Sequence, residues 1–325
     1  MALKMEQRKM EFRKEVFEIT FHYYLCPESG EQFTDIKLDA LNMDQVLHQY
    51  RERFHIPFPE EIGAIRAQYG LPAARMSEVL GLGVNSYRQY EAGEMPSISN
   101  ARLIRMAEDP EHFIDMVKLC PTIHEKYRIR YIQKAEALAE GRKRDKPMAN
   151  LRAYLLGAQQ ADIFTGYRFP SLEKISEMVV FFSSQLSPYK TKLNKLLFYA
   201  DFTMFRQRCQ SISGLRYKAI SMGPVPVNFQ SLFEYLYNEG YIDVRITEFP
   251  QGYTGEQFLV RKGRPFNAGV FQPEELEVLH RIADYFAPSS THDIIQLSHL
   301  EDAWLNNEAQ KNLISYTYAF GLRGV

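Results

Sequence analysis

Hydrophobic and polar residues follow different periods in three successive segments of the chain. Apolar and polar residues alternate over residues 16–25, a period of two that is typical of a half-buried strand. Turn-forming residues follow at 26–30, and residues 31–34 are suited to return as a second strand. The first segment, which ends near residue 50, therefore predicts a small β-hairpin.

The second segment, residues 43–116, has apolar residues at helical spacing with frequent breaks. The breaks fall at Pro57, Pro59 and Gly70 and at the turns 81–83 and 93–96. Short helices divided in this way predict a compact helical bundle.

The third segment fills the second half of the chain and mixes both periods. Helical spacing is found over residues 171–184, 190–207, 228–239, 273–286 and 291–307, and alternation over 241–249 and 256–261. The fold class predicted is α+β, mainly α with small β-hairpins. We predict four parts: a hairpin over residues 1–50, a helical bundle over 51–120, a basic helix and linker over 121–150, and a C-terminal helical domain with a hairpin over 151–325.

The composition is that of an ordinary globular protein. Of 325 residues, 45% are hydrophobic and 24% charged, which excludes collagen-like, disordered and disulfide-rich classes. No run approaches the roughly 18 apolar residues of a membrane span, and the basic N-terminus lacks the apolar region of a secretory signal. The three cysteines, Cys26, Cys120 and Cys209, are typical of reduced thiols, so we expect a cytoplasmic protein with no membrane partner.

The net charge of −1 neither favours nor excludes binding to nucleic acid, because a local basic patch can suffice. The richest basic stretch is residues 124–146, with eight Lys and Arg side chains among four acidic ones. Such a stretch is typical either of a solvated helix followed by a charged linker or of a surface for phosphates.

Residues 65–107 contain the pattern of a helix-turn-helix. Met76, Val79 and Leu80 form one apolar stripe, and the turn 81–83 then reverses the chain. The next helix is predicted from near Val84 to Gly93, with Tyr87 and Tyr90 facing inward.

The opposite face of that second helix has the chemistry for reading DNA bases. Asn85, Arg88 and Gln89 share it at spacings of three and four residues. Arg pairs with guanine, and Asn or Gln with adenine, for about 1–3 kcal/mol of discrimination each. Ser86 and Arg75 are predicted to hold phosphates. The alternative is a helix-turn-helix that serves only packing or partner binding.

The run GLGVNSYRQYEAGEMPS resembles the Xre-type DNA-binding domain of MqsA-type antitoxins. The resemblance implies that Asn85 and a residue four positions later contact operator bases. The family has an Arg at that second position, whereas this chain has Gln89 there and Arg88 beside it. This difference from the family pattern affects which bases are preferred. Proteins similar to MqsA also have an N-terminal zinc ribbon with two CxxC knuckles. This chain has Cys26 but Ser29 in place of the second cysteine, so we expect a degenerate ribbon that binds no metal.

Four motifs of the C-terminal half, KLNKLLFYAD, SGLRY, GPVP and EGYI, resemble the Panacea domain, also described as SocA-like, over about residues 170–310. The GPVP motif is predicted as a turn. Members are typically antitoxins in which this domain binds and neutralises a toxin encoded beside them, and some are proteolytic adaptors. Tyr199, Arg216 and Tyr217 are the contact residues expected from the resemblance, with core packing as the alternative for both tyrosines.

Catalytic motifs are sparse. His292, His299 and Glu301 are close in sequence, but a surface helix explains them better than a metal or proton-transfer site. The sequence shows no P-loop, nucleotide-binding glycine fingerprint or zincin motif. We therefore expect no enzyme and no cofactor.

Together these patterns lead to one hypothesis and two alternatives. The hypothesis is an antitoxin of a type II toxin–antitoxin pair that binds a cognate protein toxin through its C-terminal domain. As a homodimer it would also bind operator DNA through the helix-turn-helix. The alternatives are a transcription regulator with a non-toxin partner or ligand, and a proteolytic adaptor for a toxin.

Overall fold

The computed structural model describes residues 1–157, 160–250, 252 and 254–325. The chain is 54% helical with 15% strand in small antiparallel sheets, which confirms the predicted α+β, mainly helical class. It forms two compact units: Met1–His48 together with Leu151–Val325, and Gln49–Asn150. Within the described residues, no helix has both the length and the apolar character needed to cross a membrane.

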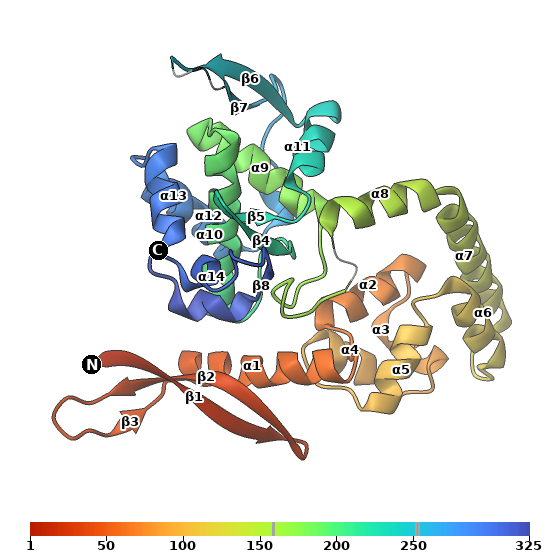
Figure 1. Ribbon diagram of the computed structural model, residues 1–325. Helices are drawn as coiled ribbons and strands as arrows, with labels where there is room; N and C mark the ends of the chain where they lie inside the picture. The colour runs from red at the N-terminus through yellow and green to blue at the C-terminus, as the bar shows by residue number, and fades with distance from the viewer. Residues whose placement is uncertain (158–159, 251, 253) are drawn as a thin grey trace. The chain divides into compact units, whose positions relative to one another are not determined.

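A three-stranded antiparallel sheet begins the chain (Figure 1). β1 (Ala2–Phe12) pairs with β2 (Glu15–Leu25) along its whole length, and β3 (Gln32–Phe33) adds two residue pairs on the other side of β2. The predicted hairpin of residues 16–25 with 31–34 is present as the two β2–β3 pairs, and the main partner of β2, the preceding strand β1, was not predicted. The strand β1 was missed because its many Lys, Glu, Gln and Arg residues are weak strand formers, and only the pairing with β2 makes it extended.

Helix α1 (Ile36–Arg53) closes the side of β2 that β3 leaves open. The Asn42 amide accepts a hydrogen bond from the backbone N–H of His22 (2.8 Å) and donates one to its carbonyl (2.9 Å). The Gln45 amide makes the same pair of bonds with Thr20, at 2.9 and 2.8 Å. Two side-chain amides thus replace a neighbouring strand, which leaves these backbone groups satisfied.

The second unit is a bundle of short helices. They are α2 (Pro59–Tyr69), α3 (Ala73–Val79), α4 (Ser86–Glu91), α5 (Ile98–Met106), α6 (Pro110–Leu119) and α7 (Glu125–Arg144). Their apolar stripes meet in one core, where the rings of Tyr69 and Phe113 stack at 3.7 Å. The bundle has the short helices that the glycine and proline breaks predicted.

The charged stretch at residues 141–147 is helical, which corrects the predicted linker. α7 continues to Arg144, and after Asp145 the chain enters α8 (Lys146–Leu156). Pro147 is tolerated because it lies in the first turn of α8, where no intrahelical N–H bond is required.

The rest of the first unit surrounds one buried helix, α10 (Lys190–Arg208), in which every residue from Lys192 to Phe205 is buried. The other helices are α9 (Leu172–Leu186), α11 (Phe229–Asn238), α12 (Pro273–Phe286), α13 (Thr291–His299) and α14 (Asp302–Leu305), with short 3-10 turns at Ala268–Val270 and Tyr316–Gly321. β4 (Tyr217–Ile220), β5 (Gly223–Pro226) and β8 (Leu313–Ile314) form one sheet, and β6 (Ile242–Glu248) and β7 (Thr254–Val260) form the predicted hairpin. Figure 1 shows α9, α12 and α13 around α10.

Two features of this region differ from the prediction. The single helix predicted over residues 291–307 is divided into α13 and α14 near Glu301. Its carboxylate is held by the Tyr199 hydroxyl at 3.2 Å and by the backbone N–H of Arg323 at 3.0 Å, so the chain bends toward the core there. The GPVP motif, predicted as a turn, is the strand β5; its two prolines fit because β5 lies at the edge of its sheet.

Candidate functional site

Helices α3 and α4, joined by a short turn, lie where the helix-turn-helix motif is predicted, and buried tyrosines fix the geometry of the pair. The Tyr87 backbone N–H donates to the Ser77 hydroxyl (3.1 Å), and its own hydroxyl donates to the carbonyl of Ile62 (2.8 Å). Gly81, with a φ of +66°, allows the left-handed turn between the helices. The rings of Tyr87 and Tyr90 are 0% and 7% exposed, as the helical spacing predicted.

Asn85, Arg88 and Gln89 all lie on the exposed side of this motif. Asn85 is the residue before the first turn of α4, and its side chain makes no capping bond. In the part of the chain that the structure describes, none of the three side chains makes an intramolecular hydrogen bond or ion pair. Three polar groups that read base edges are thus available on one surface, though their contact with DNA stays a prediction.

The two residues predicted to hold phosphates differ in their surroundings. Ser86 is half-buried at the first position of α4. The Arg75 guanidinium pairs with the Glu78 carboxylate at 2.5 Å and lies 5.6 Å from the ring centre of Tyr127. A phosphate would have to compete with Glu78 for Arg75. The ion pair therefore makes Arg75 a weaker candidate for a DNA contact than the exposed side chains of Asn85, Arg88 and Gln89.

The basic helix α7 is in part a structural element. The Arg128 guanidinium donates to the carbonyls of Val117 and Lys118, both at 2.9 Å, and to that of Cys120 at 3.0 Å. It therefore satisfies the carbonyls at the C-terminal end of α6. Lys143 pairs with Glu111 at 3.2 Å. These contacts give the two basic residues partners within their own unit rather than leaving them as a surface for phosphates.

In the first unit, the motif residues around Asp201 form a buried hydrogen-bond network. Asp201 is 0% exposed, and its carboxylate accepts bonds from the backbone N–H groups of Ile212 (2.9 Å) and Ser213 (2.8 Å). It also accepts from the Ser213 hydroxyl (2.5 Å) and the Tyr217 hydroxyl (2.7 Å). The KLNKLLFYAD and SGLRY motifs are thus joined by one carboxylate.

Two lysines of the same motif also bind backbone carbonyls. The ammonium of Lys192 donates to the carbonyls of Phe286 (2.8 Å) and Ser289 (2.5 Å), at the end of α12. The ammonium of Lys195, which is 0% exposed, donates to the carbonyl of Pro224 at 2.8 Å. Burial lowers the pKa of Lys195 to about 7. Gly223 is required beside it, because a Cβ there would lie 2.6 Å from the Lys195 Cε.

The buried lysine predicts an unusual dependence of stability on pH. The unfolded chain keeps Lys195 protonated up to its ordinary pKa of 10.5, whereas the folded chain loses that proton near pH 7. Because the unfolded state binds more protons in this window, stability rises with pH, by about 2 kcal/mol between about pH 7 and pH 9. Lys195→Met removes this contribution, so the difference in unfolding free energy between variant and parent should change by that amount.

Fluorescence of Trp304, the single tryptophan, measures this difference, because its indole lies in the same unit and donates to the carbonyl of Ile220 at 2.7 Å. The control is Leu196→Met on the same buried helix, which removes no titrating group and should give a difference independent of pH. A Lys195→Met difference that is also flat across this range would contradict the prediction.

The structure places the residues expected to contact a toxin mostly in the core. Tyr199 and Tyr217 are both 0% exposed, and their hydroxyls donate to the carboxylates of Glu301 and Asp201. Burial raises the pKa of both tyrosines. Arg216 is half-buried and forms an ion pair with Asp162. A protein that docks on this folded domain does not reach the two rings, so packing explains them.

His292 and His299 both lie on α13, whereas Glu301 follows its end and precedes α14. His292 is exposed, whereas Glu301 is only 1% exposed. The His299 ring stacks on the indole of Trp304 at 4.0 Å, and burial lowers its pKa. No group of three or more His, Cys, Asp or Glu able to hold a metal occurs among the residues that the structure describes.

Cys26 and Ser29, where a zinc knuckle would have two cysteines, contact each other instead. Hydrogen bonds lower the pKa of the Cys26 thiol to about 7. The hydrogen bond with the Ser29 hydroxyl has the largest effect, and those with the backbone of Ser29 and of Glu28 add to it. All three cysteines have free thiols.

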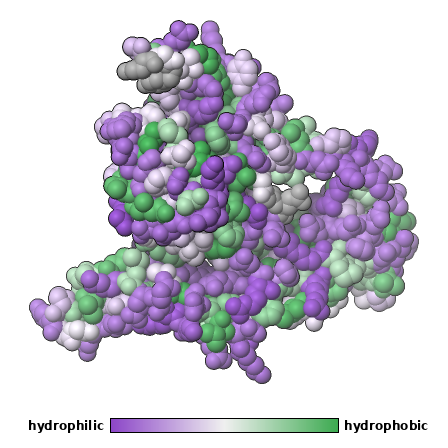
Figure 2. Space-filling model, in the orientation of Figure 1, coloured by the Kyte–Doolittle hydropathy of each residue, from purple (hydrophilic) through white to green (hydrophobic). Residues whose placement is uncertain are grey.

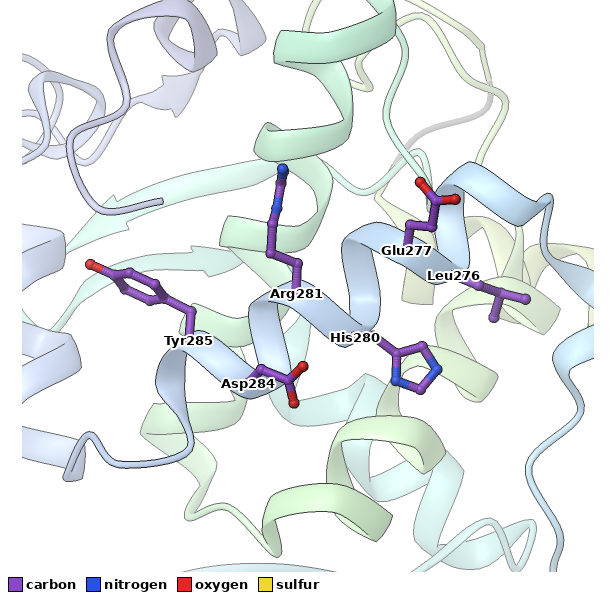
Figure 3. Close-up of a pocket in the computed structure, with 6 residues that line it drawn as sticks. All are labelled: Leu276, Glu277, His280, Arg281, Asp284 and Tyr285. Atoms are coloured by element: carbon purple, nitrogen blue, oxygen red, sulfur yellow. The ribbon is translucent and has the colours of Figure 1, made fainter.

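Two surface hollows lie on the C-terminal part of the first unit. One is an open face of α12, lined by Leu276, Glu277, His280, Arg281, Asp284 and Tyr285 (Figure 3). The other is a groove between α11 and the β6–β7 hairpin, where Phe233, Tyr237, Ile246 and Phe258 are among the lining residues. Unlike the open face of α12, the groove is bounded by separate elements, and the majority of its lining residues are apolar or aromatic, the chemistry typical of a protein-binding surface.

Lys195, Asp201 and Glu301 have structural roles that were not predicted from the sequence. The first two could have been recognised, since each is a charged residue within the mostly apolar stretch 193–205 of α10. A charge in such a position is retained when it is paired or hydrogen-bonded. Glu301 could not be recognised in this way, because its partners Tyr199 and Arg323 are far away in the chain.

Comparison with known proteins identifies part of this unit. Residues 193–305, from within α10 to the end of α14, match a family model described as "Antitoxin SocA-like, Panacea domain". The match supports the resemblance found in the C-terminal half and covers about one third of the chain. Searches of curated proteins and of solved structures gave no match.

Proposed function

We propose that this protein is the antitoxin of a type II toxin–antitoxin pair, with the antitoxin-like residues 193–305 as the part that binds a protein toxin. The single observation that supports this role is the family match, which spans the buried helix α10 and the elements packed around it. The match indicates an antitoxin-like domain, and the toxin as partner and its neutralisation are our proposal.

The groove between α11 and the β6–β7 hairpin is the surface that we propose for the toxin. All of its lining residues except Lys190 lie within the matched residues, and its side chains Tyr237 and Ile246 are 43% and 60% exposed. The ion pair between Lys190 and Glu256, at 2.6 Å, adds polar groups to the same lining. An apolar centre with polar neighbours is the usual composition of a specific interface.

The helix-turn-helix is proposed to bind the operator of the protein's own operon. A homodimer would place two recognition helices about 34 Å apart over a palindrome. Asn85, Arg88 and Gln89 supply base-reading groups that make no hydrogen bond or ion pair among the residues that the structure describes. Toxin occupancy would then change operator affinity, because binding at two sites on one protein is coupled reciprocally.

Growth arrest by the neighbouring reading frame, and its relief by this chain, tests the toxin-binding role. We expect induction of that frame to stop growth and the full chain, expressed from an unrelated promoter, to restore it. The full chain is needed because residues 1–48 and 151–325 form one compact unit. Ile246→Asp should abolish rescue, since a carboxylate would be buried against the toxin without a partner.

Two control variants make this result specific. Tyr285→Asp introduces the same charge on the exposed face of α12, where Tyr285 is 50% exposed, and should still rescue. Asn85→Ala combined with Gln89→Ala should also rescue, because it changes only the proposed DNA contacts. Arrest that the parent chain does not relieve would contradict the antitoxin role and favour a plain transcription regulator.

A further inference from the structure

The outer edge of β1 is an accessible row of backbone groups. β1 is the edge strand of its sheet, and none of its eleven residues, all described, is buried. On the far side of β2 the edge is covered by β3 and by the Asn42 and Gln45 amides. Over residues 2–11, no strand among the described residues lies beside the outer side of β1. Proteins usually cover, shorten or pair such an edge.

The direction of the outward backbone groups follows from the contacts of α1. Thr20 and His22 direct both their N–H and their C=O toward α1, away from β1. Residues opposite each other in an antiparallel ladder point their backbone groups either both inward or both outward. Gln7 is opposite Thr20, and Met5 is opposite His22. The odd-numbered residues of β1 therefore present their N–H and C=O groups to the outside.

We propose that β1 pairs with β1 of a second copy of this chain, antiparallel and about a two-fold axis at Gln7. Gln7 is the middle residue of Ala2–Phe12, so this register pairs the whole strand and joins two three-stranded sheets into one of six strands. The outward groups of Gln7 bond those of Gln7 in the second copy, and Met5 bonds Lys9 in the same way.

Charge complementarity selects this register. With the axis at Gln7, Glu6 lies opposite Arg8 of the second copy, in a pair without backbone hydrogen bonds where side chains approach most closely. A two-fold axis at Glu6 would place Glu6 opposite Glu6 of the second copy. An axis at Arg8 would place Arg8 opposite Arg8 of the second copy. Glu6 and Arg8 already meet on one face of β1, at 2.6 Å, so pairing brings together two carboxylates and two guanidinium groups in alternation.

Apolar side chains on the same strand support pairing rather than exposure to water. Leu3 and Met5 are 52% and 48% exposed, although both line a hollow of the same unit together with Phe320, and Figure 2 shows hydrophobic and hydrophilic side chains interspersed over the hairpin. In the proposed register Met5 lies beside the hydrocarbon stem of Lys9 of the second copy. The surface is separate from the α11–hairpin groove. It would supply the dimer of the proposed function, but it does not depend on toxin binding.

The test is the molecular mass of the full chain in solution, measured by light scattering and sedimentation. We expect the parent to have twice the mass of one chain at micromolar concentration. In the Arg8→Glu dimer, Glu6 of each copy lies opposite a carboxylate of the other copy. In the Glu6→Arg dimer, Arg8 of each copy lies opposite a guanidinium group. Each substitution should therefore weaken dimerisation about tenfold or more. An equal mixture of the two variants should form a heterodimer with the affinity of the parent, as should the homodimer of the double variant.

Further variants keep this test independent of folding defects. Gln7→Pro removes an outward N–H that β2 does not use, so it should give a folded monomer with the circular dichroism of the parent. Lys262→Glu, the same kind of charge change at an exposed position outside β1, should leave the dimer intact. A parent that stays monomeric at about 100 µM, or a dimer unaffected by Arg8→Glu and Gln7→Pro, overturns the proposal. The rescue of growth from the toxin is a separate experiment. Its failure would contradict the proposed antitoxin role and would leave the β1 dimer untouched.

Discussion

Asp201→Asn is expected to lower the free energy of unfolding of its unit by about 3–5 kcal/mol. The Asp201 carboxylate is fully buried and accepts four hydrogen bonds, from Ile212, twice from Ser213, and from Tyr217. An amide of the same shape replaces one acceptor oxygen with an NH2 group. That group would face donors, so at least one buried donor would lose its partner and a charge-assisted bond would be lost with it.

Chemical denaturation of the full chain, followed by Trp304 fluorescence, measures this loss in the unit that contains Asp201. The matched control is Asp243→Asn. Asp243 is 45% exposed and pairs with Arg261 at 3.1 Å, and exposed ion pairs contribute at most about 1 kcal/mol. Unfolding free energies of Asp201→Asn and Asp243→Asn that agree within error would show that the buried network is not what holds the two motifs together.

Asn85→Ala combined with Gln89→Ala is expected to reduce operator affinity by about 2–6 kcal/mol, from two contacts of about 1–3 kcal/mol each. Both side chains are exposed on the helix-turn-helix, and neither is used within the described part of the chain. Tyr87 and Tyr90, which hold the motif together, are unchanged. The variant should therefore stay folded and lose discrimination between sequences, rather than lose all affinity for DNA.

Fluorescence anisotropy at fixed salt, with the DNA upstream of the operon and a scrambled duplex of equal length, separates these effects. The control is Asn306→Ala combined with Gln310→Ala, which removes the same two side-chain types at exposed positions of the other unit. If the Asn85/Gln89 variant binds the operator as tightly and as selectively as the parent, α4 is not the recognition helix. Arg88 should then be tested as a phosphate contact through the slope of affinity against salt.

The helix-turn-helix shows how much a local pattern can predict. The 3.6-residue period is set by the backbone of one helix, so it predicts that Tyr87 and Tyr90 face one way and Asn85 and Gln89 the other. The structure has this arrangement, with the tyrosines buried and the polar residues exposed. What these side chains bind is not encoded in that period, and DNA contact stays a prediction.

By itself, the amino-acid sequence determined the fold class, the short helices α3 and α4 with their buried and exposed faces, most helices of the C-terminal half and the antitoxin-like motifs. These depend on periods and turns within a few residues. Only the tertiary structure decided which strand pairs with β2, where the helix after Thr291 divides, and that Tyr199 and Tyr217 are core residues. Each of these depends on partners far away in the chain. Phe12 and Glu15 meet next to a short turn, but Ala2 meets Leu25, and Glu301 meets Tyr199 across about a hundred residues. The free energy of such contacts comes from burial and pairing in three dimensions, which no local pattern contains.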